Sequence, residues 1–157
     1  MHEEPRYGAA CMKFMQQINK VVDDHRPATI LDYGAGKRLL RKAIKSFDAE
    51  LYEYDPGIPE IATAPIGVFD MVVCIDVLEH VEPECLADVL ADIRAKTGTV
   101  AFLTIHTGPA GKFLPDGRNA HLIQQPVYWW LEQIRPLFRS LQWDKHGELT
   151  YSVICGA

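Results

Sequence analysis

A pair of glycines and a later carboxylate are the residues of this chain most able to do chemistry. Gly34 and Gly36 follow the apolar run "TILDY", and a helical pattern begins directly after them. Glycines at a turn from strand to helix allow the backbone to approach a nucleotide closely. Asp55 ends the next apolar segment, at a position where a carboxylate can accept hydrogen bonds from both hydroxyls of a ribose. An ordinary turn and a surface aspartate are the alternative interpretation.

The spacing around the glycines distinguishes three kinds of nucleotide site. A P-loop requires a glycine five residues before its Gly-Lys pair and a Ser or Thr after it, but Leu31 and Arg38 hold these positions. A dinucleotide fingerprint requires a third glycine, where this sequence has Leu39. The pattern therefore favours a nucleoside ligand without phosphates.

The elements that must position these residues are predicted from hydrophobic spacing. Short apolar runs predict buried strands over 28–34, 49–55, 69–76 and 98–106. Helices are expected over 8–24 and 37–47, from Pro83, and from near Pro126 after a loop over 107–125. Residues 139–156 are typical of a hairpin that turns near His146. This order predicts an α/β fold: a doubly wound, mostly parallel Rossmann-like sheet with helices on both faces and a C-terminal antiparallel hairpin.

Two helix faces are predicted in detail. The first helix should bury a stripe made of Met12, Met15, Ile18 and Val22. The second should turn Leu40, Ala43, Ile44 and Phe47 inward and Arg38, Arg41, Lys42 and Lys45 outward. We interpret the basic side as a solvated charged face, with an anionic substrate or partner as the alternative.

Length and composition limit the class of protein. The 157 residues predict a single domain over 1–157, and a formal net charge of −5 argues against a general nucleic-acid binder. Four cysteines without CxxC spacing indicate reduced thiols. Because no apolar run is long enough to span a bilayer and "MHEEPRYG" lacks a signal-peptide pattern, we expect a cytoplasmic protein.

Three segments in order resemble the cofactor-site motifs of class I S-adenosylmethionine-dependent methyltransferases. They are "ILDYGAG", "LYEYDP" and "FDMVVCIDVLEHVEP", and the resemblance extends from about residue 28 to the terminal hairpin. The piece "DVLEHV" is similar to the small-molecule branch that includes ubiquinone-type methyltransferases. The resemblance implies an enzyme that uses S-adenosylmethionine, with S-adenosylhomocysteine as product, on an oxygen or nitrogen of a small molecule.

The same resemblance implies roles for single residues. Asp32, Gly34, Ala35 and Gly36 would line the methionine part of the cofactor, Asp55 would bind the ribose, and Ile75, Asp76 and Val77 would flank the sulfonium. The family motif is usually G-x-G-x-G, but its last position here is Arg38, which we expect to point outward. The segment between Asp55 and Phe69 is too short for the usual third strand, so Pro56 or Ile61 and backbone groups would contact the adenine.

Histidines are the candidates for the acceptor side, because methyl transfer needs a positioned nucleophile and sometimes a base. His121 lies in "LPDGRNAHLIQQPVYWW", which resembles the substrate loop of the same branch, and is the first candidate as base or substrate ligand. His106 is the second candidate, and a purely structural role is the alternative for both. Further substrate candidates are Asn119 in the same loop, Tyr128 and Trp129 at the following helix, and Tyr7 in an N-terminal lid.

A metal site is the alternative for the "DVLEHV" segment. Asp76, Glu79 and His80, together with a later histidine, could hold Mg or Mn, as some relatives with a Glu-x-x-Glu-His pattern hold a metal against vicinal hydroxyls, including those of small RNAs. The motif also occurs in metal-free relatives, where Glu79 and His80 would only cap and orient the next helix. We therefore predict no metal, with these two residues as the weak candidates.

Three functions remain open at this point. The first is a small-molecule methyltransferase, whose exposed pocket could be completed by a homodimer. The second is a non-catalytic partner subunit with the methyltransferase fold, favoured by the altered glycine motif. The third is an RNA methyltransferase, in one form Mg-dependent at a ribose 2'-oxygen, that reads its target through the basic face.

Overall fold

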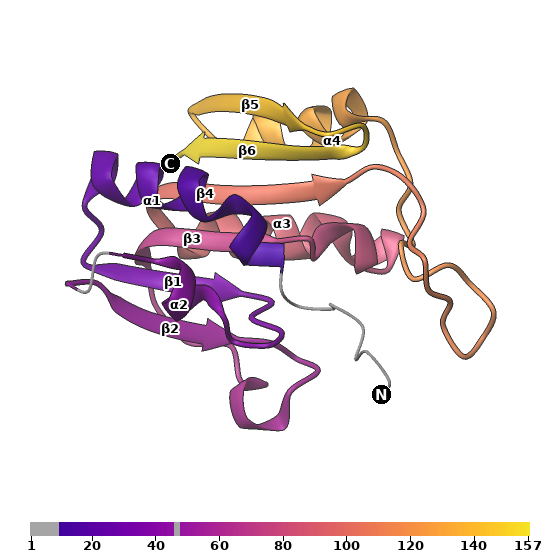
Figure 1. Ribbon diagram of the computed structural model, residues 1–157, viewed down its shortest axis with the longest axis horizontal. Helices are drawn as coiled ribbons and strands as arrows, with labels where there is room; N and C mark the ends of the chain where they lie inside the picture. The colour runs from indigo at the N-terminus through magenta and orange to yellow at the C-terminus, as the bar shows by residue number, and fades with distance from the viewer. Residues whose placement is uncertain (1–9, 46–47) are drawn as a thin grey trace.

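A six-stranded sheet forms the centre of the computed structural model, which describes residues 10–45 and 48–157 (Figure 1). The strand order is β2-β1-β3-β4-β6-β5. The strands are β1 Thr29–Tyr33, β2 Glu50–Tyr54, β3 Phe69–Ile75, β4 Thr97–His106, β5 Ser140–His146 and β6 Thr150–Gly156. Strands β2, β1, β3 and β4 are parallel, whereas β6 is antiparallel to both β4 and β5. The predicted fold class, with its terminal hairpin, is confirmed.

Helices cover both faces of this sheet. They are η1 Ala10–Phe14, α1 Met15–His25, α2 Leu40–Ala43, η2 Pro59–Ile61, η3 Leu78–His80, η4 Pro83–Cys85, α3 Leu86–Lys96, α4 Val127–Ile134 and η5 Arg135–Leu137. Figure 1 shows α1 and α2 in front of the sheet and α3 and α4 behind it. Among the helices of the described part of the chain, none combines the length and the apolar character needed to cross a membrane.

The alternation of side chains along β3 divides the core into two layers. Met71 and Val73 pack with the apolar residues of α1 and α2, and Val72 and Cys74 pack with those of α3 and α4. Successive side chains of a strand point to opposite faces, so a continuous apolar strand is what a sheet covered on both sides requires. The four cysteines are free thiols, three of them buried and Cys85 exposed.

The first helix differs from its prediction. Met12 is exposed, whereas Cys11, Phe14, Ile18, Val21 and Val22 are buried. Residues 10–14 form a 3₁₀ helix, which has three residues per turn instead of 3.6. The tighter turn brings positions 11 and 14 to the core and rotates Met12 outward.

The second helix is much shorter than predicted. It contains only Leu40–Ala43, because Gly36 and Arg38 have positive φ angles of 50° and 58° and keep the preceding backbone out of the helical region. Leu40, Ala43 and Ile44 are buried as predicted, and Phe47 lies outside the described residues. Arg38 points outward as expected, and its Nε donates to Glu53 Oε2 at 2.6 Å.

Candidate functional site

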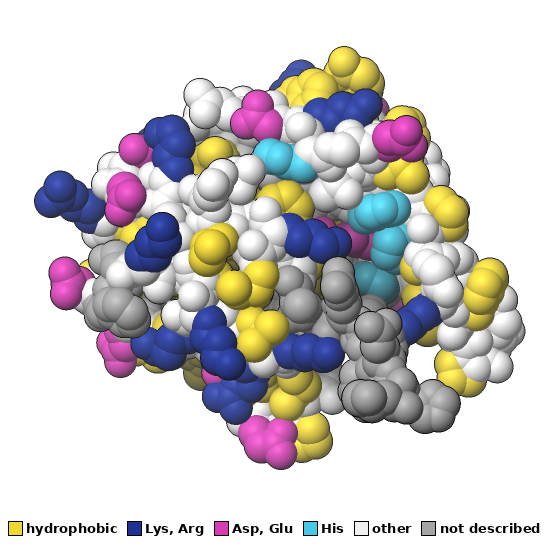
Figure 2. Space-filling view, in the orientation of Figure 1, with side chains coloured by type: hydrophobic (Ala, Val, Ile, Leu, Met, Phe, Trp, Pro, Cys, Tyr) yellow, Lys and Arg dark blue, Asp and Glu magenta, His cyan; other side chains and the backbone are white. Residues whose placement is uncertain are grey.

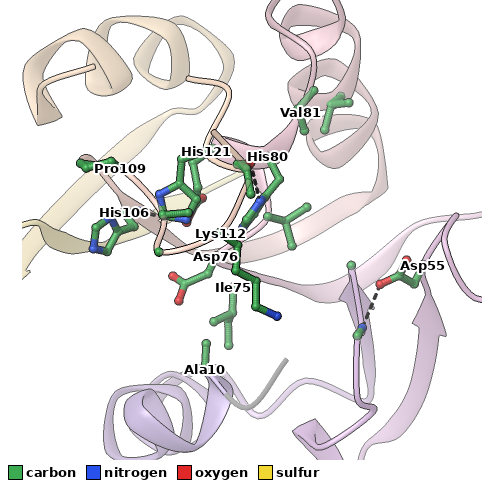
Figure 3. A pocket seen from close by; sticks show the side chains of 18 of the residues that line it. Ala10, Asp55, Ile75, Asp76, His80, Val81, His106, Pro109, Lys112 and His121 are labelled. Carbon is green, nitrogen blue, oxygen red and sulfur yellow. Dashed lines mark hydrogen bonds between the residues drawn. The ribbon is translucent and has the colours of Figure 1, made fainter. Parts of the chain in front are cut away.

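A cavity of about 860 Å³ opens beyond the carboxyl ends of β1–β4. Its walls come from the glycine turn, the segment after β2, residues 75–81 and the loop that follows β4. Figure 3 shows His80, His106 and His121 gathered at one end of this cavity and Asp55 at the other, with Ile75 and Asp76 below the histidines. The open α/β sheet thus places its pocket where such sheets bind ligands.

The glycine turn forms one wall of the cavity through its backbone. Gly34 has a φ of 80°, and the amides of Gly34 and Ala35 both donate to the Tyr54 carbonyl, at 2.7 and 3.0 Å. A Cβ atom added to Gly34 would lie 2.4 Å from Cγ2 of Val77. Residue 34 must therefore be glycine both for its backbone conformation and for the close approach of the Val77 side chain.

Two backbone amides hold the Asp55 carboxylate in place. Its Oδ2 accepts from the Gly36 amide and its Oδ1 from the Gly57 amide, each at 2.9 Å. These bonds join the second strand to the glycine turn across the cavity wall. A carboxylate fixed in this way can still accept from two ligand hydroxyls, because each oxygen has a second lone pair.

Asp32 lies behind this wall rather than in the lining of the cavity. The side chain is buried, and burial, followed by the charges of Glu53 and Asp55, raises the pKa of Asp32 to about 7. Ala35 is likewise buried and absent from the lining. Gly34, Gly36, Asp55, Pro56, Ile75, Asp76 and Val77 do line the cavity, whereas Ile61 does not.

Asp76 has a strained backbone that is fixed by a neighbouring strand. Its φ is 51°, a region that non-glycine residues rarely adopt. Its amide donates to Thr104 Oγ1 at 3.0 Å, and Thr104 Oγ1 donates to Asp76 Oδ1 at 2.7 Å. Thr104 is a residue that sequence reasoning missed, since a threonine inside an apolar strand gives no signal of its partner.

Three imidazoles from different parts of the chain meet at the other end of the cavity. The ring centroids of His80 and His121 are 4.7 Å apart, and those of His106 and His121 are 5.0 Å apart. His121 Nδ1 lies 2.7 Å from the Gly108 carbonyl, and His80 Nδ1 lies 2.8 Å from the Ala120 carbonyl. Figure 2 shows histidines side by side in a hollow of the surface, right of centre. Burial, together with His121, lowers the pKa of His80.

Glu79 lies beneath the histidines and is fully buried. Its Oε1 accepts from the His106 amide at 3.2 Å, and its carbonyl accepts from the Ile123 amide at 3.1 Å. Burial, with a smaller effect of Asp76, raises the pKa of Glu79 to about 8. Glu79 thus connects the ends of β3 and β4 with the loop over 107–125.

Several predicted substrate residues lie away from the cavity. Asn119 bonds to the backbone of its own loop, through Ala110 and His121. Tyr128 is exposed and contacts Trp143 of β5, and Trp129 packs against the core, because α4 lies behind the sheet. Tyr7 is outside the described residues.

Two lysines that the sequence analysis missed line the cavity. Lys13 comes from η1 and Lys112 from the loop over 107–125. Figure 3 shows Lys112 extending between the histidines and the glycine turn. Sequence spacing gives no signal for either residue, because each reaches the cavity only through the packing of its segment.

Comparisons with known proteins agree with this architecture. The family model described as a methyltransferase domain matches residues 5–146, and no curated protein sequence matches significantly. A candidate O-methyltransferase from Nostoc punctiforme PCC 73102 has a TM-score of 0.67 at 14% identity over 94% of this chain and 57% of its own. Human N-acetylserotonin methyltransferase in complex with SAM has a TM-score of 0.61 at 15% identity, over 96% of this chain and 56% of its own.

A third solved structure comes from Burkholderia thailandensis. Its 1,6-didemethyltoxoflavin-N1-methyltransferase, with bound 1,6-didemethyltoxoflavin and S-adenosylhomocysteine, has a TM-score of 0.60 at 19% identity over 94% of this chain and 77% of its own. The present chain spans little more than half the length of the Nostoc and human chains, and at these identities the likeness concerns the fold. With the family model matched over most of its length, the chain belongs to the methyltransferase-domain family and has the fold of class I S-adenosylmethionine-dependent methyltransferases.

Proposed function

We propose that the protein transfers the methyl group of S-adenosylmethionine to an oxygen or nitrogen of a small molecule. One observation carries this proposal: a single cavity has a backbone-lined wall with a fixed carboxylate at one end and three imidazoles at the other. The first end suits an uncharged nucleoside, and the second suits an acceptor that must lose a proton. We further propose that residues 1–157 act as one domain.

The cofactor end has the chemistry that S-adenosylmethionine needs. The Gly34–Gly36 turn would face the methionine part, Asp55 would accept hydrogen bonds from the ribose hydroxyls, and Pro56 and Ile75 offer apolar contacts. S-adenosylmethionine would supply an electrophilic methyl carbon on a positively charged sulfur. Asp76 stands near the place where that charge would lie, and Thr104 fixes its carboxylate.

The acceptor end would position the nucleophile and take its proton. In the transfer, an oxygen or nitrogen lone pair would form a bond to the methyl carbon while the carbon–sulfur bond would break and leave its electron pair on sulfur. His121 is the residue we place against the nucleophile, because its Nδ1 faces the Gly108 carbonyl and its Nε2 then carries the lone pair. His106 is the second candidate: its Nδ1 lies 3.3 Å from the Gly108 carbonyl and 3.2 Å from the Gly108 amide, and Nε2 carries the lone pair when Nδ1 donates to the carbonyl.

Calorimetric titration with S-adenosylmethionine and S-adenosylhomocysteine tests the proposal. We expect micromolar binding that falls at least about 10-fold in Asp55→Asn, since a lost charge-assisted hydrogen bond is worth about 1.5–3 kcal/mol. Asp144→Asn on β5, an exposed aspartate at the far edge of the sheet, is the matched control and should bind normally. Binding unaffected by Asp55→Asn would contradict the cofactor site.

Formation of S-adenosylhomocysteine then separates an enzyme from a binding subunit. An acceptor screen should include hydroxylated and N-heterocyclic small molecules and a short RNA, and the product should require the acceptor. Tight cofactor binding without product in any such mixture would favour the non-catalytic partner subunit.

A further inference from the structure

Glu79, His80 and His121 form a compact group of potential metal ligands at the acceptor end of the cavity. One carboxylate oxygen and one ring nitrogen of each histidine all lie within 4.8 Å of one another. Ligand atoms that share a divalent ion at about 2.0–2.2 Å lie about 3–3.5 Å apart. The ligand atoms would therefore have to approach one another by at most about 1.3–1.8 Å to share an ion.

Hydrogen bonds orient the rings of His80 and His121 in the way that is usual for histidines that bind a metal. Each ring faces a backbone carbonyl with Nδ1, His80 that of Ala120 at 2.8 Å and His121 that of Gly108 at 2.7 Å. A carbonyl only accepts, so Nδ1 carries the proton and Nε2 is left as the atom with a lone pair. A metal-ligating histidine almost always donates its other N–H to a carbonyl or carboxylate in this way.

Glu79 supplies an observation that packing alone does not explain. Its Oε1 accepts from the His106 amide, but Oε2 is fully buried and has no hydrogen-bond partner among the described residues. A buried polar atom without a partner costs free energy comparable to a lost hydrogen bond, and such atoms deserve a specific explanation. Coordination of a cation would give Oε2 a partner.

Asp76, which the sequence grouped with these residues, does not belong to the cluster. Its Oδ1 is engaged by Thr104, and its carboxylate is not within the mutual reach of the other three ligand atoms. His106 also stands outside, since its ring nitrogens are not within the mutual reach of these ligand atoms. The ligand set is thus one carboxylate and two imidazoles.

We propose that Glu79, His80 and His121 bind one first-row divalent transition ion, such as Mn²⁺, Zn²⁺ or Co²⁺, at the acceptor end of the cavity. Two imidazoles disfavour Mg²⁺, which prefers oxygen ligands. All three residues line the cavity, so the remaining coordination positions of the ion would be open to the oxygen or nitrogen of the acceptor. The inference rests on the proposed function and makes His121 act on the acceptor through the ion.

Metal binding by the whole chain, without cofactor or acceptor, tests this inference. Protein treated with a chelator is titrated with Co²⁺, whose visible d–d absorption reports nitrogen and oxygen ligands, and the melting temperature is measured in parallel. We expect one Co²⁺ per chain, a rise in melting temperature, displacement by equimolar Zn²⁺ and no displacement by a hundredfold excess of Mg²⁺.

Single substitutions locate the site. Glu79→Gln and His121→Gln should each weaken Co²⁺ binding by at least about 100-fold, because even indirect supports of a metal site are worth 10–100-fold. His106→Gln, a neighbouring histidine outside the ligand set, should change it by less than about threefold. Circular dichroism shows whether each variant is folded. Calorimetric titration with Zn²⁺ repeats the comparison of metal affinities between the variants and the wild-type chain without a spectroscopic probe.

Two results would overturn the metal site. One is no Co²⁺ absorption and no thermal shift in the wild-type chain, and the other is an equal loss of binding in His106→Gln and His121→Gln. The same samples are titrated with S-adenosylmethionine, whose binding depends on Asp55. Cofactor binding without metal binding would refute only the metal site, and metal binding without cofactor binding would refute only the proposed function.

Discussion

The two ends of the cavity are built in different ways. The cofactor end is made of backbone and short connections, since Gly34 and Gly36 lie in one turn and Asp55 reaches that turn through the Gly36 amide. The acceptor end is made of side chains from the ends of β3 and β4 and from the loop over 107–125, which meet only in the folded chain. The first end is rigid through local geometry, and the second depends on long-range packing.

This difference predicts where each end is sensitive. Substitutions in the glycine turn should damage folding and cofactor binding together, because one backbone conformation serves both. Substitutions of the histidines should leave the fold and the cofactor end largely intact and act on the acceptor or the ion. The predictions below run from the largest expected effect to the smallest.

Gly34→Ala should have the largest effect on stability, because the new methyl group would clash with Val77 Cγ2 and the φ of 80° disfavours any side chain. We expect a loss of about 2–4 kcal/mol in the free energy of unfolding and a loss of cofactor binding of at least about tenfold. Urea denaturation and calorimetry measure the two.

Gly147→Ala is the matched control for this substitution. Gly147 has a φ of 81°, but nothing lies within 4 Å of its added Cβ. It should lose only about 1 kcal/mol, the cost of the backbone conformation. An equal loss in both variants would mean that the contact with Val77 does not matter.

His121→Gln should lower turnover of an accepted substrate by about 10²–10⁴-fold, the usual contribution of a positioned acid–base group. The affinity for S-adenosylmethionine should stay within about threefold, because the cofactor end does not include this residue. Rates of S-adenosylhomocysteine formation and calorimetric titrations provide the two numbers.

His106→Gln is the sharper comparison for the acceptor end. Its ring also lines the cavity but lies outside the set of ligand atoms, so we expect less than about tenfold loss of turnover. If His106→Gln proves more damaging than His121→Gln, the assignment of the first acceptor residue must be reversed.

Glu79→Gln should flatten the dependence of stability on pH in metal-free protein. Burial raises the pKa of Glu79 from 4.5 to about 8, so the folded state binds this proton more tightly than the unfolded state does. The stability from this group is fully present below pH 4.5 and is lost as the pH rises through about 8. The wild-type chain should therefore lose about 1–3 kcal/mol more than Glu79→Gln between pH 5 and pH 8, as measured by denaturation at each pH.

Two other influences on the pH dependence of stability have to be separated from that of Glu79. Asp32, whose pKa is raised to about 7, contributes a slope of the same sign in both proteins and cancels in the comparison. A bound divalent ion would stabilise ionised Glu79 and reverse the trend for the wild-type chain alone. Parallel curves for the two metal-free proteins would show that Glu79 is not held in its protonated form.

Arg38→Gly should have the smallest effect. Glycine removes about 1–2 kcal/mol of strain at a φ of 58°, but the substitution also removes an exposed ion pair with Glu53 and increases the freedom of the unfolded chain, each worth up to about 1 kcal/mol. We expect a net change below about 1 kcal/mol by thermal denaturation. Glu53→Gln, which removes only the ion pair, is the control, and a loss above about 2 kcal/mol in Arg38→Gly would show that the arginine is needed for the turn.

The local patterns of the sequence predicted most of the fold. The apolar runs predicted β1 to β4 and the hairpin because buried parallel strands need apolar residues on both faces. They failed at the first helix, where a 3₁₀ turn replaced the α-helical spacing and exposed Met12, and at α2, where positive φ angles shortened the helix. Spacing alone carries no information on either change of backbone geometry.

The sequence by itself determined that Gly34, Gly36 and Asp55 lie at strand ends that meet in one cavity wall, because these residues follow one another in a motif, and their roles toward the cofactor stay a prediction. Only the tertiary structure decided the acceptor end. Glu79, His80 and His121 come together since the loop over 107–125 folds back over residues 75–81, with the Ile123 amide on the Glu79 carbonyl and Ala120 on His80. Tyr128 and Trp129 were predicted to bind a substrate because they are aromatic, but they belong to α4, which lies behind the sheet. Contacts between distant segments depend on how the whole chain packs, which no local spacing can specify.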